Sequence, residues 1–408
     1  MAVSTPVAEA LSRFYTKDFV SRALVALMRD EPSPYVLDLG SGPGALSHAA
    51  RIRWEASSIV SVDIDRAAET HLRALPHLRR GGGHRHIVAD ALSLHLPSTL
   101  NKVNFDAAVC NPPYREISWR PEFRVILEES GLGDLAGSAQ YTSTEVLFLA
   151  QNLRIVAPRG QLGLVVPDSI VSGRKSRALR QTLLGQHRIE RVVQLPRGSF
   201  SKTDAQAFIL VLNKGQSKAK RTLLQRLYSD GSLSGGLAIN RAQAEHRLDY
   251  EYYAQRNSPS SLQPSLSDLD AQVTRGSVEN AIARDSWSSR WVFHTTEFPP
   301  DKGSISFPVQ RSETFPPGMI WAEPGDILLA RVGRSLHKKV CFVERGRAPI
   351  TDCVLRIRLQ RQWQRAVFDA LASAKGEARL LSVSRGVAAR MISKQELLSM
   401  PLELRDGR

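Results

Sequence analysis

The chain has 408 residues, of which 42% are hydrophobic and 23% are charged. This composition is typical of a globular protein with two or three domains and excludes general disorder. The 55 Lys and Arg residues exceed the 40 Asp and Glu residues, and the formal net charge of +15 favours a polyanionic partner over a small neutral one.

The cysteines and the apolar segments indicate in which cellular compartment the protein is expected. Cys110, Cys341 and Cys353 lack the spacing of a disulfide framework or a zinc site, so we expect no structural metal. No apolar run reaches membrane-spanning length, and the N-terminal residues lack a secretory pattern. We therefore expect a cytoplasmic protein without a membrane partner.

Strand and helix patterns alternate through the first half of the chain, after a helical pattern over 9–29. Strands are expected at 35–40, 58–65, 86–90, 105–110, 160–167, 189–195 and 204–214. Helices are expected at 45–54, 66–75, 142–156 and 176–184. This order predicts an α/β fold with a Rossmann-like doubly wound parallel sheet, whose last two strands can pair as a hairpin.

The composition changes after Tyr228. Residues 229–269 are rich in Ser, Gly and Pro and are interpreted as a linker region. Beyond them, strand patterns at 326–332, 339–344 and 353–359 and a helix at 363–374 indicate a smaller β-rich α+β domain. We expect one domain over 1–228 and a second over 270–408.

A glycine-rich turn follows the first strand. Gly40, Gly42 and Gly44 allow the backbone to approach a ligand closely, and the next helix presents unpaired amides. Asp38 precedes this turn, where a carboxylate would repel phosphate and attract an ammonium group. The turn therefore favours a cofactor with a positively charged amine.

Two more acids stand at the ends of the next strands. Asp63 ends the second strand, where it can accept two ribose hydroxyls, and Asp90 ends the third, where it can accept an adenine amino group. The fourth strand ends in Asn111-Pro112-Pro113-Tyr114, and neither proline can donate to a sheet ladder. A structural proline turn is one interpretation, but the preceding acids favour a binding site at the carboxyl ends of parallel strands.

These motifs resemble those of the S-adenosylmethionine-dependent methyltransferases of the Rossmann-like class. The resemblance narrows to DNA adenine-N6 methyltransferases in which a target-recognition domain follows the cofactor half. Asp38–Gly44 is similar to their first motif, Asp63 and Asp90 to their ribose- and adenine-binding acids, and Asn111–Tyr114 to their catalytic tetrapeptide. The resemblance implies S-adenosylmethionine as the cofactor and double-stranded DNA as the partner, with the target adenine flipped out of the duplex.

The chemistry of adenine explains the tetrapeptide. The N6 lone pair is delocalised into the ring, and two acceptors on its N–H bonds would free it to attack a methyl sulfonium. The Asn111 side-chain oxygen, which also adjoins the cofactor, and the Pro112 carbonyl can serve as these acceptors. The consecutive prolines Pro112 and Pro113 keep the carbonyl out of a ladder. Tyr114 offers a face for stacking and for the positive charge that develops.

The resemblance implies two further site residues. Phe14-Tyr15-Thr16 is similar to a signature that precedes the first motif, which implies that Thr16 contacts the cofactor, although Lys17 replaces the usual proline. Phe200 matches the position of a second aromatic wall for the base. The alternative is that Phe200 is simply a core residue.

Basic residues mark two candidate DNA-binding surfaces. From Val171 to Tyr228 the sequence has thirteen Lys or Arg residues against two acids, and phosphate contacts are expected from some of Arg174, Lys175, Arg177 and Arg180. Residues 323–344 and 386–404 resemble target-recognition segments of type I specificity subunits. The positive residues there are Arg331, Arg334, Lys338 and Lys339. A solvated surface is the alternative for both groups.

Two other functions stay open from the sequence. A methyltransferase of protein glutamine or of RNA can share the tetrapeptide, and an inactive DNA-binding component can share the fold. The linker and the second domain speak against the first, and the intact Asp38, Asp63, Asp90 and Asn111 speak against the second. No Glu-x-Lys or Asp-x-Lys pattern of common metal-dependent nucleases is present, so restriction would need a separate subunit.

Overall fold

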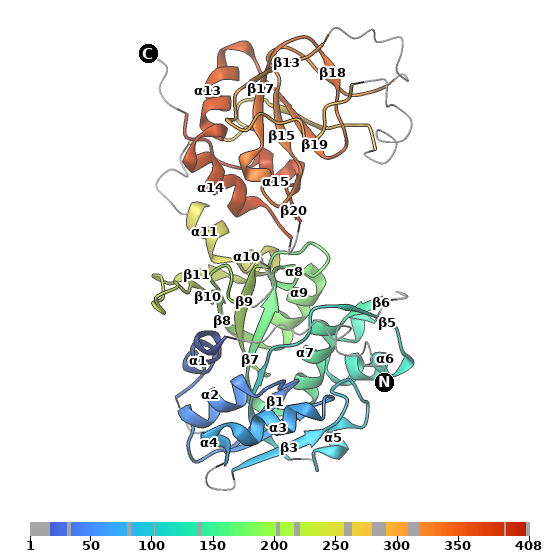
Figure 1. The fold of residues 1–408 in the computed structure, drawn as a ribbon, viewed down its shortest axis with the longest axis vertical. Coiled ribbons are helices and arrows are strands. Elements are labelled where there is room, and N and C mark those ends of the chain that lie inside the picture. Colours follow the sequence, from blue (N-terminus) through green and yellow to red (C-terminus); the bar gives the residue numbers. More distant parts are fainter. Residues whose placement is uncertain are drawn as a thin grey trace, which may run out of the picture. The chain divides into compact units, whose positions relative to one another are not determined.

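The computed structural model describes residues 17–30, 34–79, 83–101, 103–136, 141–200, 205–215, 221–256, 263–279, 291–308, 318–386 and 389–404. The chain divides into two compact units, Met1–Tyr250 and Glu251–Arg408 (Figure 1). Each unit is built around its own β-sheet.

A nine-stranded sheet in the order β11-β10-β8-β9-β7-β4-β1-β2-β3 forms the centre of the first unit. Its strands are β1 (Tyr35–Leu39), β2 (Ser58–Asp63), β3 (His84–Val88), β4 (Phe105–Cys110), β7 (Val156–Pro167), β8 (Arg188–Gln194), β9 (Ala207–Asn213), β10 (Arg221–Arg226) and β11 (Leu237–Asn240). The strands from β7 to β3 in this order all pair in parallel, which confirms the parallel sheet expected for this part.

The other four strands make the sheet mixed. Strand β9 runs antiparallel to both β7 and β8, so the expected hairpin is confirmed. Strand β10 is parallel to β8, and β11 is antiparallel to β10. Neither β10 nor β11 was expected, because both are short and their apolar residues show no clear alternation.

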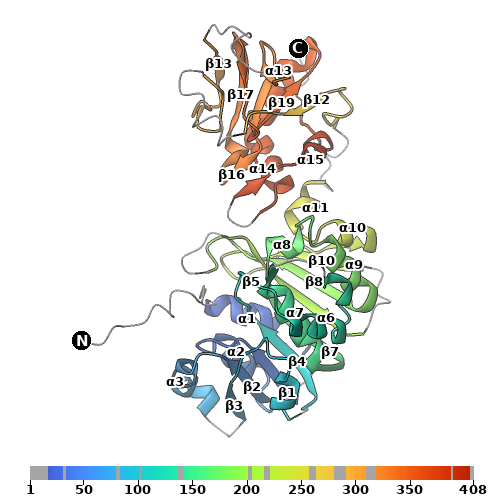
Figure 2. The same cartoon turned by 90° about the vertical axis from the view of Figure 1, so that its right-hand side faces the viewer.

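Helices cover both faces of the sheet (Figure 2). Helices α1 (Asp18–Ala26) and α2 (Ala45–Arg53) pack on one face against the side chains of Val36, Val109 and Val165. Side chains alternate along a strand, so Cys110 faces away from these two helices, and its thiol donates to the Leu39 carbonyl at 3.0 Å. Helix α7 (Thr144–Ile155) also contacts β4. Further helices of this unit are α3 (Ala67–Ala74), α4 (Pro76–Arg79), α5 (Leu96–Thr99), α6 (Pro121–Glu129), α8 (Asp168–Val171), α9 (Arg177–Gln186) and α10 (Arg241–His246).

The second unit contains a five-stranded sheet in the order β12-β19-β15-β17-β13. Its strands are β12 (Gln272–Arg275), β13 (Ser304–Ser306), β15 (Ile327–Ala330), β17 (Val340–Arg345) and β19 (Val354–Arg358). Its helices include α13 (Arg361–Ala372), α14 (Ala374–Val383) and α15 (Lys394–Leu398). The expected β-rich character and the three expected strands are confirmed.

The division between the units differs from the expected linker over 229–269. Strand β11 extends the first sheet, and α10 begins at once with a capping box, in which Asn240 accepts the backbone N–H of Gln243 at 3.0 Å. The Ser- and Gly-rich stretch before β11 is therefore a turn between two paired strands. The chain continues into α11 (Tyr250–Arg256), within which the units divide.

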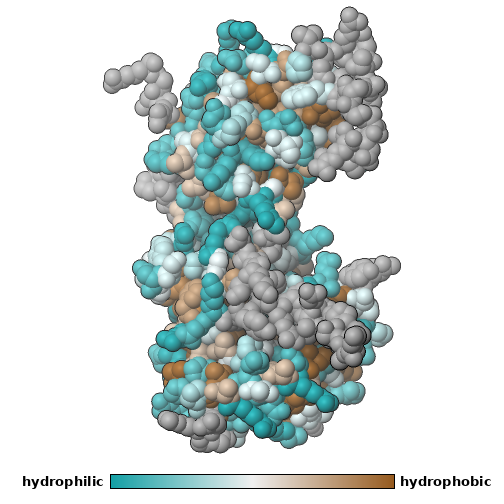
Figure 3. Space-filling view, in the orientation of Figure 1, coloured by the Kyte–Doolittle hydropathy of each residue, from teal (hydrophilic) through white to brown (hydrophobic). Residues whose placement is uncertain are grey.

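The surface carries no large apolar area on the face shown in Figure 3, where brown residues occur in small groups among hydrophilic ones. Within the described ranges, no helix combines the length and the apolar character needed to cross a membrane.

Candidate active site

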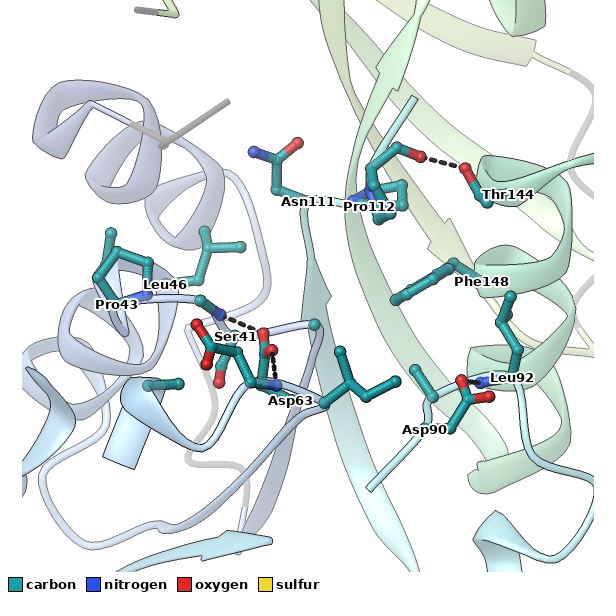
Figure 4. A pocket seen from close by; sticks show the side chains of 18 of the residues that line it. Ser41, Pro43, Leu46, Asp63, Asp90, Leu92, Asn111, Pro112, Thr144 and Phe148 are labelled. Atoms are coloured by element: carbon teal, nitrogen blue, oxygen red, sulfur yellow. Dashed lines mark hydrogen bonds between the residues drawn. The ribbon is translucent and has the colours of Figure 1, made fainter. Parts of the chain in front are cut away.

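A cavity of about 230 Å³ lies at the carboxyl edge of the parallel strands (Figure 4). It joins the glycine turn after β1 to the ends of β2, β3 and β4, which is where open α/β sheets bind ligands. Its lining comprises Gly40, Ser41, Gly42, Pro43, Ala45, Leu46, Asp63, Ile64, Asp65, Ala67, Ala68, His71, Asp90, Ala91, Leu92, Asn111, Pro112, Pro113, Arg115, Thr144 and Phe148.

The three glycines of the turn serve different purposes. The φ angle is +77° at Gly40, +50° at Gly42 and +90° at Gly44, values that residues with a Cβ rarely adopt. Gly40 and Gly42 line the cavity, as expected. Gly44 does not, and a Cβ there would lie 2.3 Å from Leu72 Cδ2 of α3. Gly44 therefore permits the packing of α2 against α3 and is not placed to touch a ligand.

Asp63 connects the end of β2 to the glycine turn. Its Oδ2 accepts the backbone N–H of Gly42 at 2.7 Å, and its Oδ1 accepts that of Asp65 at 2.8 Å. A carboxylate has about four acceptor positions, so both oxygens keep capacity for a hydroxyl. The structure thus places Asp63 in the cavity wall, where the sequence predicted it.

Asp90 follows β3 and also lines the cavity, as predicted. Its Oδ1 accepts the backbone N–H of Leu92 at 2.8 Å. The guanidinium of Arg120 lies 3.6 Å from Oδ2 and 4.5 Å from the centroid of the Phe123 ring. The ring therefore helps to hold the cation beside the carboxylate.

Asp38 is fully buried and stands outside the cavity lining. Its Oδ2 accepts both the backbone N–H and the hydroxyl of Ser47, at 2.9 and 2.6 Å. Burial raises the pKa of Asp38 to about 7, although these hydrogen bonds oppose the rise. The expected direct contact with a ligand ammonium is therefore corrected, because the side chain points to the first turn of α2 and holds that helix behind the glycine turn.

Asn111, Pro112 and Pro113 enter the cavity directly after β4, as predicted. The hydroxyl of Thr144, the first residue of α7, donates to the Pro113 carbonyl. The Thr144 N–H donates to the Arg115 carbonyl at 2.9 Å. In the described part of the chain the Pro112 carbonyl accepts no hydrogen bond. Thr144 thus fixes the backbone after Pro112 and leaves that carbonyl available to a ligand.

Two predicted aromatic site residues, Tyr114 and Phe200, do not belong to the cavity lining. Tyr114 donates its hydroxyl to Asn111 Oδ1 at 3.4 Å, and its partly buried ring packs against the core next to α1. Burial raises the pKa of Tyr114, so the phenol stays protonated and remains a donor. Phe200 is only 4% exposed and belongs to the same core. The expected second aromatic wall at Phe200 is therefore corrected, since core contacts occupy its ring.

The sequence analysis missed the apolar wall formed by α7. The ring of Phe148 covers Gly40, where a Cβ would lie 2.9 Å from Phe148 Cε1, and Thr144 lies one turn earlier (Figure 4). Residues four apart share one helix face. The available signal was a Thr and a Phe four residues apart in the helix predicted over 142–156.

The charge of the lining suits a cationic, hydroxyl-bearing ligand. Asp63, Asp65 and Asp90 bring three carboxylates into the cavity, whereas Arg115 is the single guanidinium in its lining and His71 the single imidazole. Carboxylates accept hydrogen bonds from hydroxyl and amino groups and repel phosphates. These acceptors therefore fit a nucleoside that carries positive charge and disfavour a dinucleotide, whose phosphates they would repel.

Residues 5–231, more than half of the chain, match the model of a family described as N-6 DNA Methylase. The chain belongs to the N-6 DNA Methylase family. The matched residues include the glycine turn, both cavity acids and the tetrapeptide, so the cavity lies within the region that matches the family.

Two curated relatives match parts of this N-6 DNA Methylase. The type I restriction enzyme MpnII methylase subunit of Mycoplasma pneumoniae is 28% identical over 126 residues, which cover 30% of this chain and 23% of that protein. The type II methyltransferase M.BsuBI of Bacillus subtilis is 24% identical over 198 residues, which cover 44% of this chain and 38% of that protein. The chain thus spans less than half the length of either relative.

Solved structures resemble this N-6 DNA Methylase in fold. The type IIG restriction endonuclease BpuSI aligns with 96% of this chain and 58% of its own, with a TM-score of 0.53 and 15% identity. A modification subunit of a putative type I restriction enzyme from Vibrio vulnificus covers 54% of this chain and 48% of its own, with a TM-score of 0.45 and 21% identity. At such identities a likeness concerns the fold alone.

The basic residues predicted to contact DNA divide into two groups. Arg174, Lys175, Arg177, Arg334 and Lys338 are exposed. Three others are engaged within the protein: Arg180 is 1% exposed and donates to the carbonyls of Ile170 and His246, Arg331 donates to the Asp352 carbonyl, and Lys339 donates to the Thr295 carbonyl. Arg180 is therefore corrected to a structural residue, whereas DNA contacts of the half-buried Arg331 and Lys339 stay a prediction. Thr16 lies outside the described residues.

Proposed function

We propose that this N-6 DNA Methylase transfers the methyl group of S-adenosylmethionine to N6 of an adenine that is flipped out of double-stranded DNA. One observation carries the proposal: Asn111, Pro112 and Pro113 share a single cavity with the glycine turn, Asp63 and Asp90. If the tetrapeptide acted only as a proline turn, it would not need to line a cavity together with the acids at the ends of β2 and β3.

Asp63, Asp90 and Phe148 are the residues that would hold the cofactor. Each oxygen of Asp63 has one backbone partner and can accept a ribose hydroxyl. Asp90 can accept the adenine amino group, while Leu92 and Phe148 supply apolar surface for the purine ring. When bound, S-adenosylmethionine supplies an electron-poor methyl carbon.

The target amine would be held by the tetrapeptide. Asn111 Oδ1 and the Pro112 carbonyl would accept the two N6 hydrogens, which would localise the lone pair on the nitrogen. The bound cofactor would supply the methyl group to this nitrogen, which would release one proton to solvent. The Tyr114 hydroxyl bond to Asn111 orients the amide, and its ring is the surface we assign to base stacking.

The DNA partner and the cellular setting are also part of the proposal. The exposed Arg174, Lys175 and Arg177 would contact phosphates, and residues 270–408 would read the target sequence. The two relatives are named as a type I methylase subunit and a type II methyltransferase. We therefore place the chain in a cytoplasmic restriction-modification system in which a separate subunit would cleave DNA.

Methyl transfer from labelled S-adenosylmethionine tests the proposal directly. Label should appear on N6 of adenine in mixed duplex DNA, and Asn111→Ala should lose that transfer while it still binds the cofactor. Label in RNA or in protein glutamine, with none in DNA, would support the rival substrates. Binding of DNA without transfer to any substrate would point to an inactive component.

A further inference from the structure

A second, small cavity lies in the first unit, far from the candidate active site along the sheet. Its volume of about 10 Å³ matches one water-sized group. Strands β8 and β10 run in the same direction as β7, so their first residues lie at the amino edge, opposite the carboxyl edge that carries the active site. The lining comprises Leu184, His187, Arg188, Ile189, Arg221, Thr222 and Arg241.

His187 has a buried donor without an acceptor. The residue is 7% exposed, and its Nδ1 accepts the backbone N–H of Gly215 at 3.1 Å. This bond requires an unprotonated Nδ1, so the single proton of the neutral ring is on Nε2. Nε2 is buried and has no hydrogen-bond partner in the described part of the chain. Because a buried unmade hydrogen bond is costly, an acceptor from outside the chain would complete the site.

Three of the lining residues are arginines, and none is acidic. Arg241 is paired with Glu245 at 3.0 Å. Arg188 and Arg221 are exposed, and among the described residues they form no ion pair. Water could accept the His187 hydrogen bond and hydrate the exposed arginines. An anionic oxygen accepts the same hydrogen bond and also attracts the positive charges, so it is the stronger partner.

We propose that this cavity is a phosphate-binding site, in which His187 Nε2–H donates to one oxygen of a phosphate group and the guanidinium groups of Arg188 and Arg221 bind the other oxygens. Guanidinium forks match the geometry of phosphate, which presents several oxygens in a compact group. The phosphate is supplied either by a small phosphorylated molecule or by a DNA backbone segment away from the reacting base. The site does not depend on the proposed methyl transfer.

Calorimetric titration with inorganic phosphate tests the site in the full chain. We expect saturable binding in excess of that of chloride at equal ionic strength. The double variant Arg188→Gln/Arg221→Gln should weaken it by about tenfold or more, a change of about 1.4 kcal/mol for each factor of ten. The matched control is Arg85→Gln, an exposed arginine of β3, which should bind like the wild type.

Nitrogen NMR of His187 tests the predicted hydrogen bond directly, because it detects the Nε2–H group. Phosphate should shift the Nε2–H resonance in the wild type with the same saturation curve as the calorimetry, and Nδ1 should remain unprotonated. The absence of saturable binding, an Nε2–H resonance that phosphate leaves unchanged, or an unimpaired double variant would each overturn the proposal and leave a buried water as the occupant.

Competition separates the two sources of phosphate. If the source is a DNA backbone, the double variant should bind a duplex more weakly and inorganic phosphate should compete with the duplex. If the source is a small molecule, duplex affinity should be equal in both proteins while phosphate binding is still lost in the double variant. Either outcome retains the site and identifies its ligand.

Discussion

Gly42 and Gly44 of the glycine turn are expected to respond differently to substitution by alanine, and the difference can be estimated. At Gly44 a Cβ would lie 2.3 Å from Leu72 Cδ2, and φ is +90°. At Gly42 φ is +50° and no atom lies within 4 Å of the added Cβ. Gly44→Ala should therefore suffer both backbone strain and a clash, whereas Gly42→Ala should suffer strain alone.

The magnitudes follow from these two terms. Placing a Cβ in a left-handed conformation costs roughly 1–2 kcal/mol, and overfilling a packed site costs roughly 1–3 kcal/mol. We expect Gly44→Ala to lower the free energy of unfolding of the first unit by about 2–5 kcal/mol. Gly42→Ala should lower it by about 1–2 kcal/mol and should instead weaken cofactor binding, because its new methyl group enters the cavity.

Hydrogen exchange read by mass spectrometry suits this comparison, since amides of β1 and α2 report the opening of the first unit alone. A calorimetric titration with S-adenosylmethionine gives the second measurement. If Gly44→Ala proves no less stable than Gly42→Ala, the assignment of Gly44 to helix packing is incorrect. If Gly42→Ala binds the cofactor as tightly as the wild type, the turn does not contact it.

Four further substitutions test other parts of the site. Asn111→Ala should lower the methylation rate at least about a hundredfold, as loss of an essential catalytic hydrogen bond does, with cofactor affinity little changed. Thr144→Val should lower kcat roughly tenfold by releasing the Pro113 carbonyl, whereas Thr144→Ser should retain activity. Arg115→Ala, at the cavity rim, should raise KM for DNA and reduce the salt dependence of binding by about one phosphate contact. Asp38→Asn should remove a pH dependence of stability. The folded-state pKa of Asp38 is raised from 3.8 to about 7. As pH rises between these two values, the free energy of unfolding of the wild type should therefore fall by up to about 4 kcal/mol.

Each of these has a contrary outcome. Activity in Asn111→Ala comparable with the wild type would remove the tetrapeptide from the mechanism. Equal rates for Thr144→Val and Thr144→Ser would show that the hydroxyl does not position the backbone. An unchanged KM for DNA in Arg115→Ala would place the phosphates elsewhere, and equal pH profiles of hydrogen exchange would show that Asp38 is not the titrating group.

The motifs at strand ends could be predicted because a strand and the residues that follow it are recognised from a short stretch of sequence. Asp63, Asp90 and Asn111 each end a strand that reads clearly from the sequence, and parallel strands bring their carboxyl ends to one edge whatever the details of packing. The same logic does not apply to Asp38, which stands in the same pattern. Its buried side chain accepts two hydrogen bonds from Ser47 of α2, a contact between segments that the local pattern does not contain.

The amino-acid sequence by itself determined the alternation of strands and helices, the glycine turn, the acids at the strand ends and the tetrapeptide, since periodicity and turn chemistry act over a few residues. Only the tertiary structure decided that Gly44 and Phe200 serve packing, that Phe148 and Thr144 complete the cavity, and that Arg221 lines the same small cavity as His187. These facts depend on contacts between segments far apart in the chain, whose distances no local pattern contains.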